Sequence, residues 1–462
     1  MITMKFGGTS MGSAERIASV AHIVRSSISR EEMPIVVVSA MSGVTNLLLD
    51  AAYSAVQGEP SEKREKILKK LKFQHMETAE LLVQDAYQRR QIDTFLRLEF
   101  DHLREFLSAI AIIRELSPLS HDEVVSLGEK LSAALLAAHL NDSGTQAEYV
   151  DLSHLVSKPF SQIDSDFFDH VEEDIKRRVR PIVDKKCIPV LTGFFGRIPG
   201  GIVEGVGRGY SDFTAALSGA AFNVQEIQIW TDVDGLLSAD PRLVKYTCVL
   251  PEVSYDEAGE LAQFGAKVLH PQTVWPAVKR SIPVRIKNTM NPEAPGTLIT
   301  RDGTRGQFLC KSVASKKGVT VITLTSSRML MAVGYLADVF AIFKKHGVSV
   351  DVVATGEISV TMTVDLPLES ISEKALEELK TFSRIDILEK QAIICAVGSE
   401  LTHQKGAAAR MLDAIADADI SVRAISQSAQ EINISVIMNE SDADVALLAL
   451  HKAIFEGDHQ ER

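Results

Sequence analysis

The chain has 462 residues, which is enough for about three domains of roughly 150 residues each. Its composition, 45% apolar and 24% charged, is that of an ordinary globular protein and excludes a disordered or fibrous one. The formal net charge of -12 argues against nucleic acid or an anionic membrane as the main partner, because either would favour a dominantly basic surface.

The opening of the chain alternates strand and helix signals. Residues 2–6 predict a buried strand and residues 35–38 a second one. Between them, Ser13 is a candidate N-cap for a helix whose apolar residues recur at helical spacing, namely Ile17, Val20, Val24 and Ile28. Apolar runs at 188–195, 226–231 and 283–287 predict further strands, with amphipathic helices between them. This alternation predicts a doubly wound α/β domain.

Residues 60–116 interrupt this alternation. They are charged, have a helical period and carry no strand signal. We expect an all-helical excursion here, to which the sequence assigns no function.

A polar stretch at 301–306 ends the large domain, and two similar units follow it. Residues 319–389 and 392–455 each carry the strand–helix–strand–strand–helix order of a ferredoxin-like unit. The second unit lacks a final strand, and we expect residues 308–314 to supply it, which would interleave the two units. The predicted boundaries are therefore 1–301 for the large domain, 318–390 for the first unit, and 307–316 with 391–456 for the second.

Other sequence features favour a cytoplasmic protein. The first residues do not form a signal peptide, and the longest uncharged run, residues 33–49, contains too many polar residues for a membrane span. The cysteines are far apart and include neither a CxxC pair nor a nearby histidine cluster: Cys187, Cys248, Cys310 and Cys395. We expect reduced, mostly buried thiols and no metal-binding cluster.

The segment Lys5-Phe6-Gly7-Gly8-Thr9-Ser10 has the ingredients of a phosphate site. Glycines let backbone N–H groups approach an anion, a helix N-terminus adds partial positive charge, and Lys5 adds a full one. A tight strand-to-helix turn with a solvated lysine explains the same residues. These residues alone leave both interpretations open.

A second glycine-dense stretch, 193–209, leads into Arg208, Ser211 and Asp212. A loop followed by a capped helix accounts for the glycines, with Ser211 or Asp212 as the N-cap. That interpretation leaves Arg208 without a role, whereas an arginine at this position can bind a carboxylate through two parallel hydrogen bonds.

Further polar residues follow the later predicted strands. Thr231, Asp232 and Arg242 could line a nucleotide site at the carboxyl edge of the sheet, although Asp240-Pro241 is also a simple turn. Lys267 lies beside a glycine. We expect His270, which precedes Pro271, to be a packed or capping residue rather than a base.

Taken together, these segments resemble the aspartate kinases of the amino-acid-kinase family. The resemblance runs nearly end to end and depends on KFGGTS from Lys5, SAMSGVTN from Ser39, LGEKLS from Leu127, GRGYSD from Gly207, WTDVDG from Trp230, DPR from Asp240 and FGAKVLHP from Phe264. It implies a three-layer αβα sandwich with a mostly parallel sheet, followed by two ferredoxin-like ACT domains. It also implies phosphorylation of the β-carboxylate of L-aspartate by ATP with Mg²⁺, the first step of lysine, threonine and methionine biosynthesis.

The resemblance implies a role for each site residue. Lys5 and Lys267 would flank the transferred phosphoryl group, and Asp212 would hold the lysines without acting as a base, because the β-carboxylate is already ionised. The ATP contacts would be Lys5, Phe6, Gly7, Gly8, Thr231, Asp232, Leu237, Arg242 and Lys267. The aspartate contacts would be Ser39, Thr45, Glu129, Arg208 and Ser211, with Glu129 on the ammonium and Arg208 on a carboxylate.

In the tail, the resemblance implies an amino-acid effector site formed by Met329, Gly334, Tyr335, Leu336 and Asp351. Lysine or threonine would be the inhibitor. Tyr335 and Gly356 depart from the family pattern, so reduced sensitivity is the alternative. Tyr210 replaces a second glycine in the substrate loop, and Leu237 replaces a tyrosine beside the adenine.

Because exposed sheet edges are docking surfaces, we expect a homodimer through the ACT domains. The end of the chain at Arg462 leads us to expect a monofunctional enzyme. One rival interpretation is a related kinase that acts on glutamate, N-acetylglutamate, carbamate or a nucleotide. Another is an amino-acid-sensing regulatory subunit with weak or no kinase activity.

Overall fold

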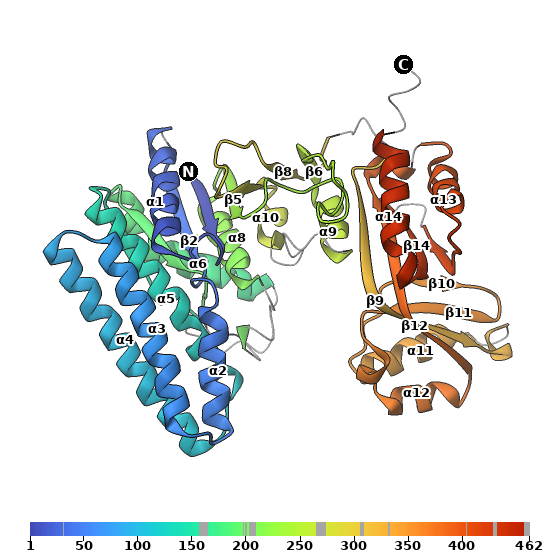
Figure 1. Ribbon diagram of the computed structural model, residues 1–462, viewed down its shortest axis with the longest axis horizontal. Helices are drawn as coiled ribbons and strands as arrows, with labels where there is room; N and C mark the ends of the chain where they lie inside the picture. Colours follow the sequence, from blue (N-terminus) through green and yellow to red (C-terminus); the bar gives the residue numbers. More distant parts are fainter. Residues whose placement is uncertain are drawn as a thin grey trace. The chain divides into compact units, whose positions relative to one another are not determined.

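The computed structural model divides into two compact units (Figure 1). The first comprises Met1–Leu236 and Val268–Gly303, and the second comprises Leu237–Lys267 and Thr304–Arg462. The structure describes all residues except 31, 157–164, 197, 199–200, 203–208, 265–273, 305–308, 331–332, 403, 428–431 and 457–462. Segment 237–267 therefore belongs to the second unit, although in sequence it lies within the predicted large domain at 1–301.

The first unit contains a mostly parallel sheet in the order β3-β4-β2-β1-β5-β7-β8. Its strands are β1 (Ile2–Phe6), β2 (Pro34–Val38), β3 (Ala147–Val150), β4 (Ile188–Thr192), β5 (Glu226–Thr231), β7 (Val284–Asn288) and β8 (Thr297–Thr300). Neighbours from β3 to β7 run parallel, and only β8 is antiparallel to β7. The predicted strands are confirmed. The sequence analysis missed β3 and β8, which are short and only partly buried.

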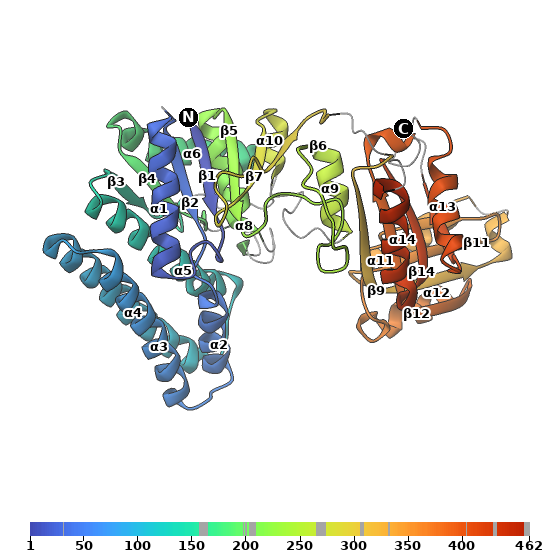
Figure 2. The ribbon, with the colours of Figure 1, turned by 45° about the horizontal axis from the view of Figure 1, so that its top comes forward.

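Helices cover both faces of this sheet, which confirms the predicted αβα sandwich (Figure 2). They are α1 (Ala14–Ser29), α2 (Val44–Val56), α3 (Ser61–Leu82), α4 (Ala86–Ile113), α5 (Pro118–Asp142), α6 (Ser165–Asp184), α8 (Tyr210–Phe222) and α10 (Trp275–Lys279). The excursion at 60–116 is helical as predicted: α3 and α4 pack on α2 and α5. Ser13 caps α1 by accepting a hydrogen bond from the backbone N–H of Arg16.

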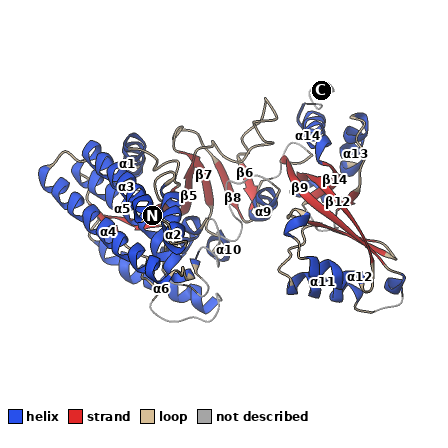
Figure 3. Cartoon of the chain, turned by 60° about the horizontal axis from the view of Figure 1, so that its bottom comes forward, coloured by secondary structure: helices blue, strands red, loops and turns tan. Residues whose placement is uncertain are grey.

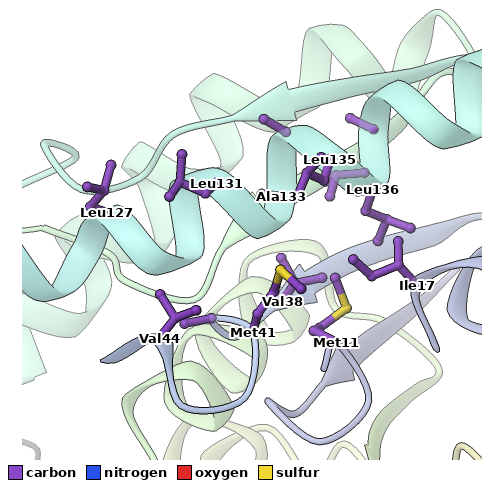
Figure 4. Packing of buried hydrophobic residues seen from close by; sticks show 14 of the residues in the cluster. Met11, Ile17, Val38, Met41, Val44, Leu127, Leu131, Ala133, Leu135 and Leu136 are labelled. Carbon is purple, nitrogen blue, oxygen red and sulfur yellow. The ribbon is translucent and has the colours of Figure 1, made fainter. Parts of the chain in front are cut away.

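The core of the first unit centres on α5, whose side chains are buried on nearly all sides. Leu127, Leu131 and Leu135 of this helix pack near Val38 and Val44 (Figure 4). An alanine in place of Gly128 would put its Cβ 2.7 Å from that of Ala40, so α5 and the end of β2 are in close contact. A helix buried this deeply can hold a polar side chain in a fixed position.

The second unit has an antiparallel sheet in the order β10-β11-β9-β12-β14-β13. Its strands are β9 (Ser312–Thr325), β10 (Val353–Thr355), β11 (Ser359–Val364), β12 (Arg384–Val397), β13 (Ala424–Ser426) and β14 (Asn433–Asn439). Its helices are α11 (Tyr335–Lys345), α12 (Glu373–Lys380), α13 (Ala407–Asp417) and α14 (Ala443–His451), and β6 (Glu252–Ser254) and α9 (Tyr255–Gln263) belong to it as well.

Two 14-residue strands, β9 and β12, run through this sheet (Figure 3). Residues 312–317 of β9 pair with 392–397 of β12, and residues 319–325 of β9 pair with 384–391 of β12, with an irregularity in between. The start of β9 thus lies beside the strands of the second ferredoxin-like unit, and its end lies beside those of the first. The exact domain boundaries stay a prediction.

Other expectations concern thiols and membrane segments. All four cysteines are free, as predicted, and Cys310 and Cys395 are buried. The expectation of mostly buried thiols was wrong for Cys248, which is exposed in the loop after Tyr246. In the part of the chain that the structure describes, no helix has the length and apolarity needed to span a membrane.

Candidate active site

The carboxyl ends of β1, β2, β4 and β5 meet at one edge of the parallel sheet of the first unit. Lys5 lies near the end of β1, Ser39 directly follows β2, and Gly193 directly follows β4. Thr231 ends β5. Since ligands of open α/β sheets bind at this edge, these residues form the candidate site.

Lys5 forms an ion pair with Asp212, with 2.6 Å between Lys5 Nζ and Asp212 Oδ1, and both residues are largely buried. Asp212 is in the first turn of α8. The expectation that Ser211 or Asp212 caps this helix was wrong. Gly209 is the N-cap, with the left-handed φ of 102° that glycine tolerates, so α8 begins at Tyr210, two residues earlier than a Ser211 cap would allow. The Asp212 side chain is thereby available to Lys5, and the Ser211 hydroxyl lies 2.9 Å from the Ser39 hydroxyl.

Three glycines bring backbone close to these side chains. A Cβ on Gly8 would lie 3.1 Å from the carbonyl oxygen of Ala40. On Gly193 it would lie 2.5 Å from Ser211 Cβ and 2.9 Å from Glu129 Oε1, which no real side chain permits. Gly7 donates its N–H to the carbonyl of Trp230 at 3.1 Å. Gly193 therefore leaves room for the Ser211 and Glu129 side chains, while Gly7 and Gly8 lie against neighbouring backbone.

Glu129 projects from the buried helix α5, and its Oε2 has no hydrogen-bond partner within the described structure. Burial raises its pKa to about 8, against the lowering effects of Lys5 and of a backbone hydrogen bond from Phe194; Asp212 adds to the increase. A buried carboxylate with an open oxygen costs stability unless a ligand supplies the missing partner. This is the strongest sign of a cation-binding position in the site.

Asp122 is a polar residue that the sequence analysis missed. It lies two helical turns before Glu129 on α5, and such spacing places both side chains on one face. Its Oδ2 accepts a hydrogen bond from the backbone N–H of Ile202 at 2.7 Å, while its buried Oδ1, 4.0 Å from His121 Nδ1, has no hydrogen-bond partner among the described residues. The two-turn spacing between the carboxylates was the signal that could have revealed it.

Tyr210, one of the departures from the family pattern, packs its ring edge-on to Phe194 with centroids 5.8 Å apart. Burial first, and then the negative charges of Glu129 and Asp122, raise the pKa of its phenol well above the usual range. Tyr210 therefore remains a neutral hydrogen-bonding group beside the two carboxylates.

The remaining predicted contacts of the first unit lie on different elements. Thr45 is half-buried in the first turn of α2. Thr231 donates its hydroxyl hydrogen bond to Asp232 Oδ1 at 3.2 Å. Arg208, Lys267 and His270 lie outside the described residues.

Two predicted nucleotide contacts, Leu237 and Arg242, belong to the second unit. The carbonyl of Leu237 accepts a hydrogen bond from the Ser312 hydroxyl at 2.9 Å. The Arg242 guanidinium is exposed and binds Asp240, with 2.6 Å between Arg242 Nη2 and Asp240 Oδ2. The Asp240-Pro241-Arg242 segment thus forms a turn that is closed by its own ion pair.

Four of the predicted effector residues, Met329, Gly334, Tyr335 and Leu336, lie in or just before the start of α11 in the second unit, whereas Asp351 lies beside Thr363, near the other end of β11. Gly334 caps the helix with a φ of 98°, and Met329 and Leu336 pack on the core. Tyr335 is buried, with its hydroxyl 2.6 Å from that of Ser383. Asp351, on the segment before β10, forms an ion pair with Lys316.

Comparison with known proteins identifies the family. The model of the amino acid kinase family matches residues 1–288, and an ACT domain model matches residues 394–454. The chain is 38% identical to aspartokinase 1, chloroplastic, of Arabidopsis thaliana, with 99% of this chain and 81% of that protein aligned. This chain belongs to the aspartokinase family.

Other aspartokinases align over nearly their whole lengths. The lysine-sensitive aspartokinase 3 of Escherichia coli is 31% identical over 99% of both chains. The solved structure of E. coli aspartokinase III in complex with aspartate and ADP covers 98% of this chain and 100% of its own, at 30% identity and a TM-score of 0.80. An aspartate kinase of Clostridium acetobutylicum also has a TM-score of 0.80, at 27% identity.

Proposed function

We propose that the chain is an aspartate kinase, which transfers the γ-phosphoryl group of ATP to the β-carboxylate of L-aspartate. The products are ADP and 4-phospho-L-aspartate. The observation that carries this assignment is the Lys5–Asp212 pair beside the open carboxylate of Glu129, at the carboxyl edge of the sheet. A family relative of known structure holds aspartate and ADP, which supports the same pair of substrates.

The reaction needs positioned charge more than acid–base chemistry. A β-carboxylate oxygen forms the new bond to the γ-phosphorus while the bond to the bridging oxygen breaks, and ADP keeps that electron pair. Lys5, fixed by Asp212 at 2.6 Å, neutralises charge on the moving phosphoryl group. The N–H of Gly8 is a proposed donor to phosphate oxygens, whereas the N–H of Gly7 is occupied by the Trp230 carbonyl. Phe6, Gly7, Thr231 and Asp232 stay proposed nucleotide contacts from the family resemblance. Leu237, Arg242 and Lys267 stay proposed nucleotide contacts from the family resemblance.

Glu129 is the proposed partner of the substrate α-ammonium, because it is buried and its Oε2 accepts no hydrogen bond from any residue that the structure describes. Ser39, Ser211 and Thr45 would supply hydroxyl hydrogen bonds to the same small molecule, and Arg208 would bind a carboxylate. A free ammonium distinguishes aspartate from an N-acylated or nucleotide substrate. Glu129 therefore favours a free amino acid over N-acetylglutamate, carbamate or a nucleotide, and membership of the aspartokinase family supports aspartate over glutamate.

Magnesium fits this site as an ion carried by the nucleotide. Among the described residues no group of three His, Cys, Asp or Glu side chains could hold a metal ion. Mg²⁺ commonly needs only one or two carboxylates besides phosphate oxygens and water, and Asp232 offers one at the end of β5. When bound, the ion would neutralise charge on the phosphates.

We further propose that an amino acid binds the first ACT unit and changes the kinase activity. A lysine-bound T-state of the E. coli enzyme and the name of its lysine-sensitive relative support this type of regulation. A homodimer through the ACT domains and a cytoplasmic location are part of the same proposal. The amino-acid-sensing subunit is the alternative function, and the observed Lys5–Asp212 pair speaks against it.

The deciding experiment is ATP turnover by the purified chain with L-aspartate, in which the acyl phosphate is trapped by hydroxylamine. Product that depends on aspartate is expected, and none with N-acetyl-L-aspartate, which lacks the ammonium. Folded protein that yields no trapped product would refute the kinase assignment. Equal turnover of the two substrates would refute the role of Glu129.

A further inference from the structure

Helix α3 of the first unit has one buried face and one exposed face. It packs on α2 and α4 (Figure 1), and its buried residues include Leu68, Leu71 and Leu82. From residue 66 onward its exposed residues recur at helical spacing and form one stripe. This α3 stripe consists of Lys66, Lys69, Lys70, Phe73, Glu77, Glu80 and Leu81.

The charges of the α3 stripe are sorted by sign. Its N-terminal half carries only lysines and its C-terminal half carries the glutamates, with Phe73, which is 68% exposed, between them. Nearby lysines that lie off the stripe have partners: Lys63 pairs with Glu59, and Lys72 with Asp101. Among the described residues, no ion pair is formed by any lysine or glutamate of the stripe.

This order of charges is unfavourable for a helix that faces only water. The helix dipole favours acidic residues near the N-terminus and basic residues near the C-terminus, which is the opposite order. Lys66 and Lys70, four residues apart, repel each other, as do Glu77 and Glu80, three residues apart. A partner surface with the complementary order of charges would turn both features into attractions.

We propose that the α3 stripe is an interface between two copies of this chain, in which two α3 helices lie antiparallel about a two-fold axis near Phe73. Lys66 and Glu80 are equally far from Phe73 along the helix, so reversing one helix brings each lysine opposite the other copy's glutamate. Lys70 and Glu77 come opposite each other in the same way. The stripe is therefore complementary to itself, as a two-fold interface requires.

The sorted charges also favour a second copy over other partners. An anionic membrane or a nucleic acid would attract the lysines but would be repelled by Glu77 and Glu80, which lie on the same face. Two copies of the stripe satisfy both halves at once, and they cover Phe73. This interface lies on the first unit and is separate from the proposed dimer through the ACT domains, so the inference goes beyond the proposed function.

The test measures the mass of the full-length chain by light scattering after size exclusion, over a series of concentrations. Two double variants each give the stripe mostly one sign of charge. Lys66→Glu/Lys70→Glu makes it acidic, and Glu77→Lys/Glu80→Lys makes it basic. The control, Lys176→Glu/Lys185→Glu, makes the same change of net charge as the acidic variant at two exposed lysines in and just after α6.

Each double variant should assemble to half the wild-type mass, with the dissociation constant of the α3 interface raised at least about tenfold, because attractions become repulsions. The control should keep the wild-type mass. An equimolar mixture of the acidic and basic variants should recover the wild-type mass, because an acidic stripe then faces a basic one. Circular dichroism should show folded variants, since both follow the helix dipole.

A monomeric wild type would overturn the inference, and that measurement does not depend on any variant folding. Folded double variants that keep the wild-type mass would also overturn it. So would a mixture that fails to recover that mass, because the stripe would then have a partner other than its own copy. Aspartate-dependent hydroxamate formation tests the kinase assignment separately, and an active chain with an unchanged mass in both variants would remove only the α3 interface.

Discussion

Each unit contains a buried lysine–carboxylate pair, and the two pairs differ in the hydrogen bonds made by the carboxylates around them. In the second unit, Glu257 of α9 is fully buried and accepts hydrogen bonds from Lys311 at 2.8 Å and from the N–H groups of Ser254 at 2.8 Å and Ser399 at 2.9 Å. Lys311 also donates to the carbonyl of Glu252 at 3.1 Å. Burial alone would raise the pKa of Glu257, but these partners lower it.

The Lys5–Asp212 pair of the first unit lies beside the Glu129 carboxylate, one oxygen of which has no hydrogen-bond partner in the described part of the chain. Glu129 keeps an open oxygen, and its pKa is raised rather than lowered. Buried polar groups normally have hydrogen-bond partners within the protein. A pair whose hydrogen bonds are all made therefore indicates a structural role, whereas a site with a missing hydrogen bond indicates where a ligand binds. The comparison predicts that mutations at the first pair affect activity and that mutations at the second affect stability.

The largest effect is expected from Lys5→Ala. Turnover should fall by about 10³-fold or more, because the variant loses a charge that stabilises the transition state. Hydroxamate formation measures the rate, and circular dichroism checks that the variant is folded. A rate within a few-fold of wild type would remove Lys5 from the catalytic residues.

Lys311→Met should instead act on folding. Removing the lysine leaves Glu257 buried without its counter-ion, which should lower the free energy of unfolding by about 3–5 kcal/mol. Urea denaturation measures the change. The double variant Lys311→Met/Glu257→Gln should recover part of it, because the uncompensated charge is gone. An unchanged midpoint for the single variant would contradict the structural role.

Glu129→Gln should weaken aspartate binding more than it slows turnover. A hydrogen bond to a charged group contributes about 1.5–3 kcal/mol, so KM for aspartate should rise by about 10- to 150-fold. KM for ATP should stay close to the wild-type value. Equal increases in both constants would indicate a general disturbance of the site.

Two matched glycine substitutions, one beside each pair, test the same difference between the two units. In Gly193→Ala the new Cβ meets Ser211 and Glu129, whereas in Gly398→Ala it lies 2.9 Å from Cys310 Cα and 3.0 Å from Lys311 N. Each should cost about 1–3 kcal/mol of overpacking. We expect the first to appear mainly in kcat/KM for aspartate and the second mainly in thermal stability. The opposite result would contradict the assignment of the Lys5–Asp212 pair to activity and of the Lys311–Glu257 pair to stability.

The pH dependence of kcat/KM is the smallest expected effect on activity. With a pKa of about 8, Glu129 is mostly protonated in the free enzyme at neutral pH, so kcat/KM for aspartate should rise as pH increases through 8. The native state also binds a proton that the unfolded chain releases near the ordinary glutamate pKa of 4.5. Stability should therefore fall as pH rises from about 4.5 to 8, and Glu129→Gln should lack this loss. A flat kcat/KM profile in the wild type would contradict the raised pKa.

Local sequence was sufficient for much of the fold. The strands at Ile2–Phe6 and Glu226–Thr231 were predicted with their exact limits, because short apolar runs bounded by turn residues are strong strand signals. The Ser13 cap and the helical excursion were also predicted correctly. The cap of α8 was not, since serine and aspartate favour N-cap positions, but here the backbone freedom of Gly209 decided where the helix begins.

The candidate site could be predicted only residue by residue. Lys5, Asp212 and Glu129 were named from motifs, but Asp122 was not, because its two-turn spacing from Glu129 indicates a shared helix face and does not show that both carboxylates are buried. Nor could sequence show that Lys316 reaches Asp351, 35 residues away, because that contact depends on how three strands are ordered in a sheet.

The sequence by itself determined the family, the α/β order of the first unit and the residue types available for chemistry, because these follow from local pattern and motif. Only the tertiary structure decided which charges are satisfied. Burial and hydrogen-bond partners come from segments far apart in the chain. They leave Glu129 Oε2 without a hydrogen-bond partner among the described residues, whereas the Glu257 carboxylate is hydrogen-bonded to Lys311.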